Sequence, residues 1–260
     1  MLKPDYSANR LRLDEALVNL GHYKSRSRAR DAIVRGTILV DGMPILRPSQ
    51  LVSSVNTIAL DDPARGYVSR AALKLIHGLD HFGLSPEGKV ALDIGASTGG
   101  FVEVLVERGA SHVIGVDVGH GQMERRIAGN RKVTNLEGQN ARELDEDHLD
   151  GRIVEFVTSD VSFISIKLAL PPALDLAAIG AQCVILVKPQ FEAGREAIGK
   201  GGMLKDPTQS MPVALELERW FVEDMGWRSL GLIDSPIEGS DGNKEYLLGG
   251  IKETNGTDDE

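Results

Sequence analysis

Residues 89–119, KVALDIGASTGGFVEVLVERGASHVIGVDVG, decide the fold of this chain. Two short apolar runs, 90–94 and 112–116, have the length of strands, and each carries a carboxylate at or just beyond its end, Asp93 and Asp117. Between them lie a small-residue turn and a helix predicted over 101–108 that Gly109 closes. Parallel strands need such a crossover helix. The stretch therefore predicts one βαβ unit, with a ligand site at the carboxyl ends of its strands.

The turn has the spacing G-x-x-x-G-G, which differs from the G-x-G-x-x-G of a dinucleotide site. Asp93 stands before the glycines, where a carboxylate suits a cationic amino-acid end, and Asp117 can accept from ribose hydroxyls. These features resemble S-adenosylmethionine-dependent methyltransferases. NAD binding and a turn without a ligand remain the alternatives at this point.

Composition is that of an ordinary globular protein: 260 residues, 42% hydrophobic and 26% charged. This length suits one large domain plus a small one. We expect no membrane association, because no apolar run approaches the roughly 20 residues of a membrane span and the N-terminus has no signal-peptide pattern. Cys183 is the single cysteine, so no internal disulfide can form, and a cytoplasmic location is expected.

The net charge of −9 hides a basic segment near the N-terminus. Residues 10–35 hold seven basic side chains against three acids. The pattern predicts helices over 11–20 and 26–35, the second capped by Ser25, then a hairpin around Asp41 and Gly42 and a strand within 55–60. A solvated helix face is the alternative interpretation of the charges.

Two short helices followed by a β-ribbon, RLDEALVNLGHYKSRSRARDAIVRGTILVDG, resemble the S4 RNA-binding domain over residues 10–60. The resemblance implies that a set of polar side chains faces RNA phosphates: Arg12, Lys24, Ser25, Arg26, Arg28 and Arg30. Few aromatic side chains accompany them, so we expect recognition of backbone and shape rather than base stacking.

The alternation of strands and helices continues along the chain. We predict strands at 132–136, 152–158 and 182–187 and helices that include 69–82 and 212–225. An edge pair of strands is predicted at 230–235 and 245–250. We expect an α/β fold with a doubly wound, mostly parallel sheet behind a small α+β domain. The predicted division is an RNA-binding domain at 1–60, a linker at 61–66, a catalytic domain at 67–251 and a disordered tail at 252–260. The glycine- and lysine-rich segment 194–206 is predicted to be a mobile loop.

Lys188 follows the apolar run CVILV, where burial lowers the pKa of a lysine and suits it to act as a general base. A strand-end lysine that reaches water is the alternative. Asp93, Asp117 and Asp160 are expected at the same edge of the sheet.

Five segments occur in the order GYVSRAALKL, DIGASTGGF, TSDVSFIS, LVKPQFE and GNKEYLL. Together they resemble the RrmJ/FtsJ-type ribose 2′-O-methyltransferases, and with the S4 domain they resemble the TlyA, or haemolysin, family of ribosomal RNA methyltransferases over about residues 9–250. The resemblance implies a catalytic set of Lys74, Asp160, Lys188 and Glu245. It implies S-adenosylmethionine contacts from Asp93, Gly95, Ala96, Ser97, Gly99, Gly100, Phe101, Asp117, Val118, Asn140 and Asp160. Asn140 replaces an acid that relatives of the broader fold often carry, so a plain turn residue is its alternative role.

The implied activity is S-adenosylmethionine-dependent 2′-O-methylation of ribosomal RNA. The expected target is cytidine in the large-subunit RNA, and a second target in the small-subunit RNA is an extension of this expectation. No His/Cys cluster suggests a metal. Two alternatives come from other classes: a non-catalytic ribosome-binding or assembly factor, and the membrane-lytic activity that the haemolysin name suggests.

Overall fold

The structure is a computed structural model that describes residues 10–239 and 242–254. The chain separates after Gly66 into two compact units, the second beginning at Tyr67. Each unit is described by itself. Residues 1–9 of the predicted RNA-binding domain and the predicted tail beyond Thr254 lie outside the described residues.

The first unit packs two helices, α1 (Leu13–Asn19) and α2 (Arg26–Val34), on a small sheet. That sheet has the order β3 (Met43–Pro44), β2 (Ile38–Val40), β5 (Ile58–Leu60), and a separate antiparallel pair joins β1 (Leu11–Arg12) to β4 (Leu51–Val52). Its core includes Leu13, Leu17 and Ile33, none of them exposed. The first helix was predicted two residues too early, because β1 pairs with β4.

Two local predictions for the first unit are confirmed. The Ser25 side chain caps α2 by accepting a hydrogen bond from the Arg28 amide at 3.4 Å. Asp41 and Gly42 both have positive φ, 52° and 81°, as a two-residue hairpin turn requires, and they connect β2 to β3.

The segment predicted as a linker is partly built into the first unit. Asp62 is almost fully buried, and its carboxylate accepts from the Tyr23 hydroxyl at 2.8 Å and pairs with Arg35 at 3.0 Å. Ala64 is 2% exposed. Sequence patterning marked 61–66 as a linker because proline and glycine break both periodicities, but it could not show that these side chains have partners 20 to 40 residues earlier.

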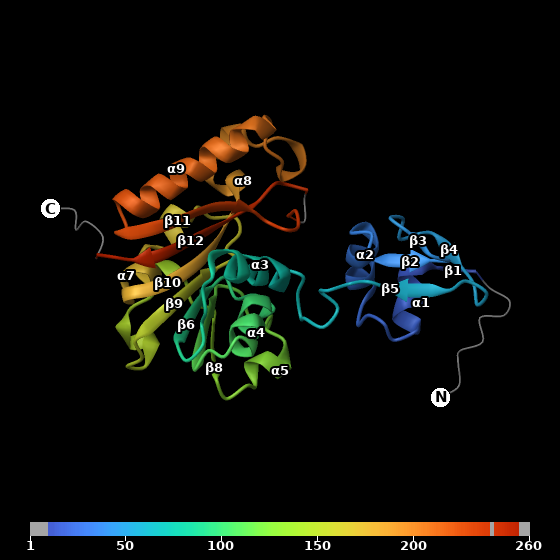
Figure 1. The fold of residues 1–260 in the computed structure, drawn as a ribbon, viewed down its shortest axis with the longest axis horizontal. Helices are drawn as coiled ribbons and strands as arrows, with labels where there is room; N and C mark the ends of the chain where they lie inside the picture. Colours follow the sequence, from blue (N-terminus) through green and yellow to red (C-terminus); the bar gives the residue numbers. More distant parts are fainter. Residues whose placement is uncertain (1–9, 240–241, 255–260) are drawn as a thin grey trace. The chain divides into compact units, whose positions relative to one another are not determined.

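The second unit is a three-layer α/β domain around a seven-stranded sheet (Figure 1). Its strands are β6 (Val90–Ile94), β7 (His112–Asp117), β8 (Val133–Glu137), β9 (Val154–Ser159), β10 (Ala177–Val187), β11 (Trp227–Asp234) and β12 (Tyr246–Lys252). They lie in the order β8-β7-β6-β9-β10-β12-β11. The first five are parallel, and β12 and β11 are antiparallel at one edge. The predicted doubly wound, mostly parallel sheet is confirmed.

Helices cover both faces of this sheet. One face packs against α3 (Ala72–Phe82), α4 (Gly100–Glu107) and α5 (Arg125–Ala128), and the other against α6 (Ile166–Ala169), α7 (Pro171–Asp175) and α9 (Ser210–Glu223). Two apolar cores result, one on each face of the sheet. The remaining helical pieces are short: α8 (Pro189–Glu192), η1 (Ala141–Glu143), η2 (Glu146–Leu149), η3 (Arg195–Ala197), η4 (Lys200–Gly202) and η5 (Pro207–Gln209).

Two predictions for the second unit need correction. Helix α3 begins at Ala72, because the Ser69 hydroxyl accepts from the Ala71 amide in a turn before the helix. The predicted tail includes Lys252, which is the last residue of β12 and is buried, with its ammonium donating to the backbone carbonyls of Leu174, Asp175 and Ala177. The predicted mobile loop at 194–206 is hydrogen-bonded within itself, as described below.

Candidate active site

The chain reverses direction across the sheet between β6 and β9, because β7 and β8 extend to one side of β6 and β10 follows on the far side of β9. Ligands bind in the crevice at such a switch point, beyond the carboxyl ends of the strands. A cavity of about 600 Å³ opens there. That volume lies within the range of small-molecule sites.

This cavity gathers most of the side chains that the sequence singled out. Its lining includes Lys74, Gly95, Ala96, Ser97, Gly100, Phe101, Asp117, Val118, Asn140, Asp160, Lys188 and Glu245. Asp93 and Gly99 do not line it: Asp93 lies behind the turn with no exposed surface, and Gly99 is the residue before α4.

The turn after β6 is held against its neighbours by backbone contacts. Gly95 and Ala96 donate to the carbonyl of Val116 at the end of β7, and the Asp160 amide donates to the Ile94 carbonyl at 3.0 Å. Gly95 has φ +84°, and a Cβ there would lie 2.9 Å from the Asp160 carbonyl oxygen. Glycine at this position therefore allows the turn after β6 to lie directly against the backbone of Asp160.

Asp93 is a fully buried carboxylate behind this turn. The Thr158 hydroxyl donates to its Oδ1 at 2.7 Å, while Oδ2 has no hydrogen-bond partner among the described residues. Burial raises the pKa of Asp93 to about 7; the Thr158 hydrogen bond opposes this rise, and the negative charges of Asp160 and Asp117 add to it. An orphan acceptor at this depth suits a cationic ligand group nearby.

Asp117 closes the other side of the turn. Its Oδ2 accepts from the Ser97 amide at 2.8 Å, and its Oδ1 accepts from the Gly119 amide at 2.7 Å. The next residue, Val118, is an exposed apolar side chain in the cavity wall. Asn140 also lines the cavity, and its side chain caps η1 by accepting from the Arg142 amide at 3.1 Å. That contact fits the alternative role of Asn140 as a turn residue.

The four predicted catalytic side chains form two ion pairs at the cavity. Lys74 Nζ lies 2.5 Å from Glu245 Oε2, and Lys188 Nζ lies 2.5 Å from Asp160 Oδ1. Lys74 comes from α3, Glu245 precedes β12, and Asp160 and Lys188 follow β9 and β10, so four separate segments supply them. Each lysine is buried and meets a carboxylate.

Sequence reasoning missed one polar side chain of this site and one buried glutamate elsewhere in the domain. The Ser162 hydroxyl accepts from Lys188 Nζ at 2.7 Å, so a hydroxyl and a carboxylate together fix the ammonium. Its signal was its place in TSDVSFIS, two residues after Asp160. Glu103 on α4 is buried, and it accepts from the Val68 amide at 2.7 Å and pairs with Arg126. Nothing in the local sequence distinguished it from a surface glutamate.

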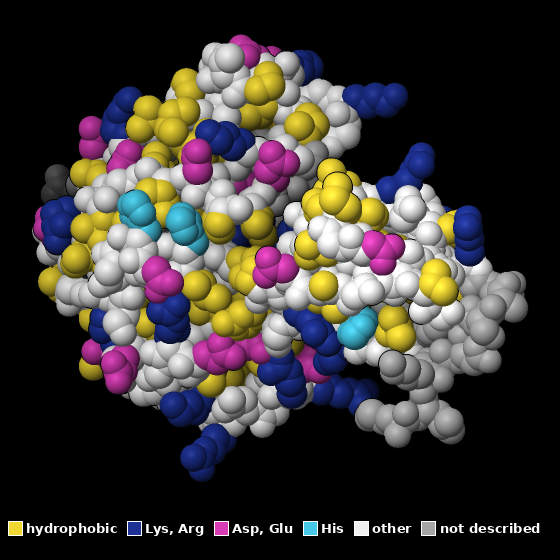
Figure 2. Space-filling model, turned by 45° about the vertical axis from the view of Figure 1, so that its right-hand side comes forward, with side chains coloured by type: hydrophobic (Ala, Val, Ile, Leu, Met, Phe, Trp, Pro, Cys, Tyr) yellow, Lys and Arg dark blue, Asp and Glu magenta, His cyan; other side chains and the backbone are white. Residues whose placement is uncertain are grey.

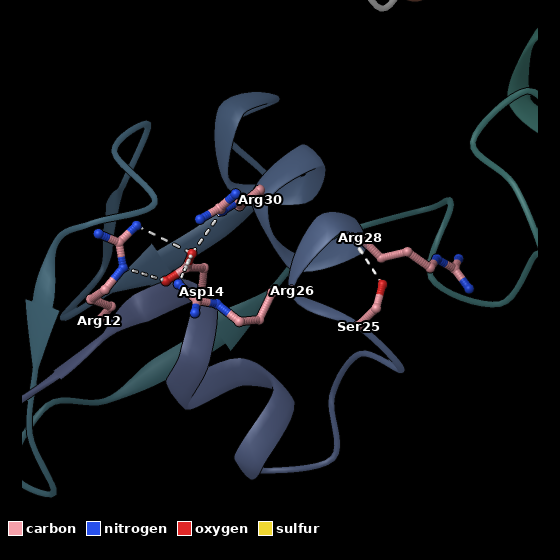
Figure 3. Close-up of polar contacts among 6 residues, drawn as sticks. All are labelled: Arg12, Asp14, Ser25, Arg26, Arg28 and Arg30. Carbon is pink, nitrogen blue, oxygen red and sulfur yellow. Dashed lines mark hydrogen bonds and ion pairs between the residues drawn. The ribbon is translucent and has the colours of Figure 1, made fainter.

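The predicted RNA-facing side chains of the first unit divide into two groups (Figure 3). Arg12, Arg26 and Arg30 surround Asp14, with nitrogen–oxygen distances of 3.0, 2.9 and 2.8 Å. Asp14 has no exposed surface. Burial by itself would raise the pKa of Asp14, but the hydrogen bonds from the three guanidinium groups outweigh it and hold this pKa well below its usual range.

Arg28 extends away from this cluster, and it donates to the Ala64 carbonyl at 3.3 Å. Ser25 uses its hydroxyl for the helix cap, and Lys24 is exposed beside it. The structure thus brings three of the six predicted residues together around Asp14. In the sequence, Asp14 counted only as one of the three acids in the basic segment.

Within the described ranges, no helix has the length and apolar character to cross a membrane. The same ranges contain no group of three or more His, Cys, Asp or Glu side chains that could hold a metal ion.

Comparisons with known proteins agree with this geometry. Residues 67–252 match the family described as FtsJ-like methyltransferase, and residues 11–57 match the S4 domain. A Mycobacterium tuberculosis protein named 16S/23S rRNA (cytidine-2′-O)-methyltransferase TlyA is 41% identical over 242 residues, covering 93% of this chain and 90% of that relative. A Brachyspira hyodysenteriae protein named Hemolysin A is 35% identical over 237 residues, covering 91% and 98%.

A solved structure from Streptococcus thermophilus, described as a hemolysin, is similar with a TM-score of 0.73 and 35% identity, covering 96% of this chain and 91% of that one. The fold, the glycine turn and the matches to both domain families agree. The chain belongs to the FtsJ-like methyltransferases, in the TlyA family that joins an S4 domain to the methyltransferase domain.

Proposed function

We propose that this protein methylates the ribose 2′-hydroxyl of cytidine in ribosomal RNA, with S-adenosylmethionine as methyl donor. One observation carries the proposal: Lys188, fixed by Asp160 and Ser162, lines the same cavity as the glycine turn, and the Asp160 backbone touches that turn at Gly95. The candidate proton acceptor, Lys188, and the turn that would hold the cofactor thus line the same cavity. The relatives named as cytidine-2′-O-methyltransferases indicate the nucleotide.

The side chains present fit S-adenosylmethionine. Its ammonium and sulfonium groups are cationic, and Asp93 and Asp160 place negative charge behind and beside the turn. Asp117 would hold the ribose, and the exposed Val118 would lie against the adenine. Gly95, Ala96, Ser97, Gly99, Gly100 and Phe101 would supply the close backbone around the amino-acid end. When bound, the cofactor supplies an electrophilic methyl group.

Lys188 has the position of the general base. A ribose hydroxyl is a weak nucleophile until its proton is removed, and Lys188 Nζ is held at the cavity by two oxygen contacts at 2.5 and 2.7 Å. For that role the ammonium must first release its own proton. Lys74 and Glu245 form the opposite pair and would orient the substrate ribose or a phosphate. Alignment of the hydroxyl for in-line transfer supplies much of the acceleration in such a site.

The arginine cluster around Asp14 would bind the RNA backbone. Three guanidinium groups and one carboxylate leave a net positive surface, and the arginine side chains remain 40 to 52% exposed. Lys24 and Arg28 would extend this surface, and Ser25 would stay within it as the cap of α2. With ribosomal RNA or a ribosomal subunit as partner, the protein would act in the cytoplasm.

The test is transfer of labelled methyl groups to ribosomal subunits and to free ribosomal RNA, followed by mapping of 2′-O-methyl sites. We expect transfer by the wild type and a loss of at least about 100-fold in Lys188→Met, because general-base catalysis contributes about that factor. Lys167→Met is the matched control, since Lys167 forms an exposed ion pair with Glu216. Cofactor-bound wild type that methylates no ribosomal particle would refute the proposal.

The two alternative functions predict other results in the same preparations. An assembly factor would bind subunits equally well as wild type and Lys188→Met, with no methyl transfer by either. A membrane-lytic protein would release dye from liposomes of defined composition. The buried pairs Lys74–Glu245 and Lys188–Asp160 favour the enzyme, because two desolvated ion pairs at one cavity are costly features to maintain without chemistry.

A further inference from the structure

The segment between α8 and α9 is a closed hairpin rather than an open loop. Ile198 and Leu204 form a β-bridge, Gly199 donates to the Met203 carbonyl at 2.7 Å, and Lys205 donates to the Ala197 carbonyl at 2.9 Å. We name residues 194–206 the basic hairpin. Its backbone therefore forms hydrogen bonds within the segment.

Asn243 forms hydrogen bonds that join the basic hairpin to the segment that leads into Glu245. This side chain is 4% exposed, and its Nδ2 donates to the Gly202 carbonyl at 3.0 Å while its Oδ1 accepts from the Leu204 amide at 3.4 Å. Asn243 stands two residues before Glu245. A buried amide that bonds both ways to the hairpin tip therefore ties it to the segment that carries a predicted catalytic carboxylate.

The other end of the hairpin is tied to Lys188. That lysine is the N-cap residue of α8 (Pro189–Glu192), and the hairpin begins two residues after this helix ends. Figure 1 shows the segment between α8 and α9 next to the stretch that leads into β12. The hairpin thus follows the helix whose N-cap residue is Lys188, and its tip is bonded to Asn243, two residues before Glu245.

The basic hairpin carries three cations. Arg195, Lys200 and Lys205 are exposed, and the Lys205 ammonium donates to the Glu196 backbone carbonyl at 2.8 Å. The Asp206 carboxylate accepts hydrogen bonds from the amide and the hydroxyl of Thr208. Within residues 10–239 and 242–254, no carboxylate lies within ion-pair distance of Arg195 or Lys200.

Two other surface lysines of the unit are paired with carboxylates. Lys167 pairs with Glu216 and Lys244 with Asp234, both at 3.1 Å. On the face in Figure 2, dark blue and magenta side chains lie among one another across the surface. Within the described residues, Arg125, Arg131, Arg142 and Arg219 are also exposed without a carboxylate partner. Location distinguishes Arg195 and Lys200, because Asn243 joins their hairpin to the segment that leads into Glu245. Cations at that place suit an anionic partner.

We propose that the basic hairpin binds the phosphate backbone of the RNA strand whose ribose enters the cavity, through Arg195 and Lys200. This inference rests on the proposed function, since it takes RNA as the substrate. The flanking phosphates of a ribose lie within a few ångströms of it, so a substrate at Lys188 carries phosphates past the edge of the cavity. Asn243 acts as a positioning residue, because it holds the hairpin against the segment that leads to Glu245.

The first experiment compares the wild type with the double variant Arg195→Ala/Lys200→Ala. We expect KM for RNA to rise about 10-fold, kcat at saturating RNA to stay within about twofold, and the slope of log affinity against log salt to fall by about 1.4, the value for two contacts to a single strand. Cofactor affinity should be unchanged. Lys167→Ala is the control, and it should leave KM and slope at wild-type values.

The second variant, Asn243→Ala, removes the fastening and leaves every cation in place. We expect faster amide hydrogen exchange at 199–205 together with a raised KM for RNA, whereas the salt slope keeps its wild-type value. RNA binding is measured separately from methylation with cofactor present. Wild type that binds RNA without methylating it refutes the proposed function only, and the salt slopes still judge the hairpin. An unchanged slope in the double variant, or a loss in kcat and cofactor affinity instead of KM, overturns the inference about the hairpin.

Discussion

Asp14→Asn is the sharpest test of how the first unit organises its arginines. The substitution keeps the shape of the side chain and removes its charge. Asp14 has no exposed surface and lies within 3.0 Å of guanidinium nitrogens from Arg12, Arg26 and Arg30. Breaking one side of a fully buried ion pair costs roughly 3–5 kcal/mol. These arginine side chains are 40 to 52% exposed and can be solvated once released, which reduces the cost.

We therefore expect Asp14→Asn to destabilise the first unit by about 2 kcal/mol, which corresponds to an increase of about 30-fold in the exchange of amides that open only on its unfolding. Hydrogen exchange by mass spectrometry on peptides from α1, α2 and β2 of the full chain measures this. Asp31→Asn is the matched control, because Asp31 is partly exposed and pairs with Arg35 within one helix. It should cost only a few tenths of a kcal/mol.

RNA binding supplies the second readout of the same variant. Removal of Asp14 adds one net positive charge to the cluster, and this extra attraction is screened as salt rises. Release of the arginines, in contrast, costs affinity at every salt concentration. We expect near wild-type affinity for ribosomal RNA at low salt and weaker binding at 150 mM and above. Wild-type exchange and wild-type binding at high salt would show that Asp14 does not organise the cluster.

Three further outcomes follow from the second unit. Burial raises the pKa of Asp93 to about 7, so protonated Asp93 stabilises the fold fully below its unfolded pKa, and this stabilisation is lost as pH rises through 7. Between pH 6 and pH 8, the free energy of unfolding of cofactor-free wild type in urea should fall by about 1.4 kcal/mol more than that of Asp93→Asn. Parallel pH profiles of the two proteins would contradict this. Gly95→Ala should abolish cofactor binding, because its Cβ would lie 2.9 Å from the Asp160 carbonyl oxygen, whereas Gly88→Ala shares the positive φ but meets nothing within 4 Å and should bind normally in calorimetry. Cys183 has no exposed surface and burial raises its pKa well above the ordinary value, so native protein should resist iodoacetamide at pH 8 until it is unfolded; stoichiometric labelling of the native protein would contradict this.

Sequence patterns predicted the features of this fold that depend on neighbouring residues. The βαβ unit, the Ser25 cap and the turn at Asp41 and Gly42 all follow from local rules of periodicity, capping and backbone conformation, and all are present. Element ends were less accurate where tertiary pairing decided them. Strand β1 shortened the first predicted helix by pairing with β4, and β10 runs from Ala177 although its apolar run begins at Gln182.

The site was predictable as a set of residues but not as a set of contacts. The family resemblance supplied Lys74, Asp160, Lys188 and Glu245, yet the pairing of each lysine with one carboxylate depends on four segments up to 171 residues apart. Ser162 and Asn243 carried only weak local signals. The side chain of Lys252 looked like part of a polar tail, although three backbone carbonyls hold it at the end of β12.

Net charge gives a poor account of how this acidic chain would bind RNA, because many of its carboxylates are used to hold cations in place. Asp14 draws three arginines into one cluster, Asp160 and Glu245 each fix an active-site lysine, and Asp62 pairs with Arg35. Each such carboxylate subtracts from the formal charge while it lowers the entropy that a cation loses on binding phosphate. Removing a buried acid should therefore weaken RNA binding at about 150 mM salt and above, even though it makes the protein more positive. Removing an exposed acid such as Asp80, which pairs with Arg108 on the surface, should strengthen RNA binding slightly at low salt and have no effect at high salt.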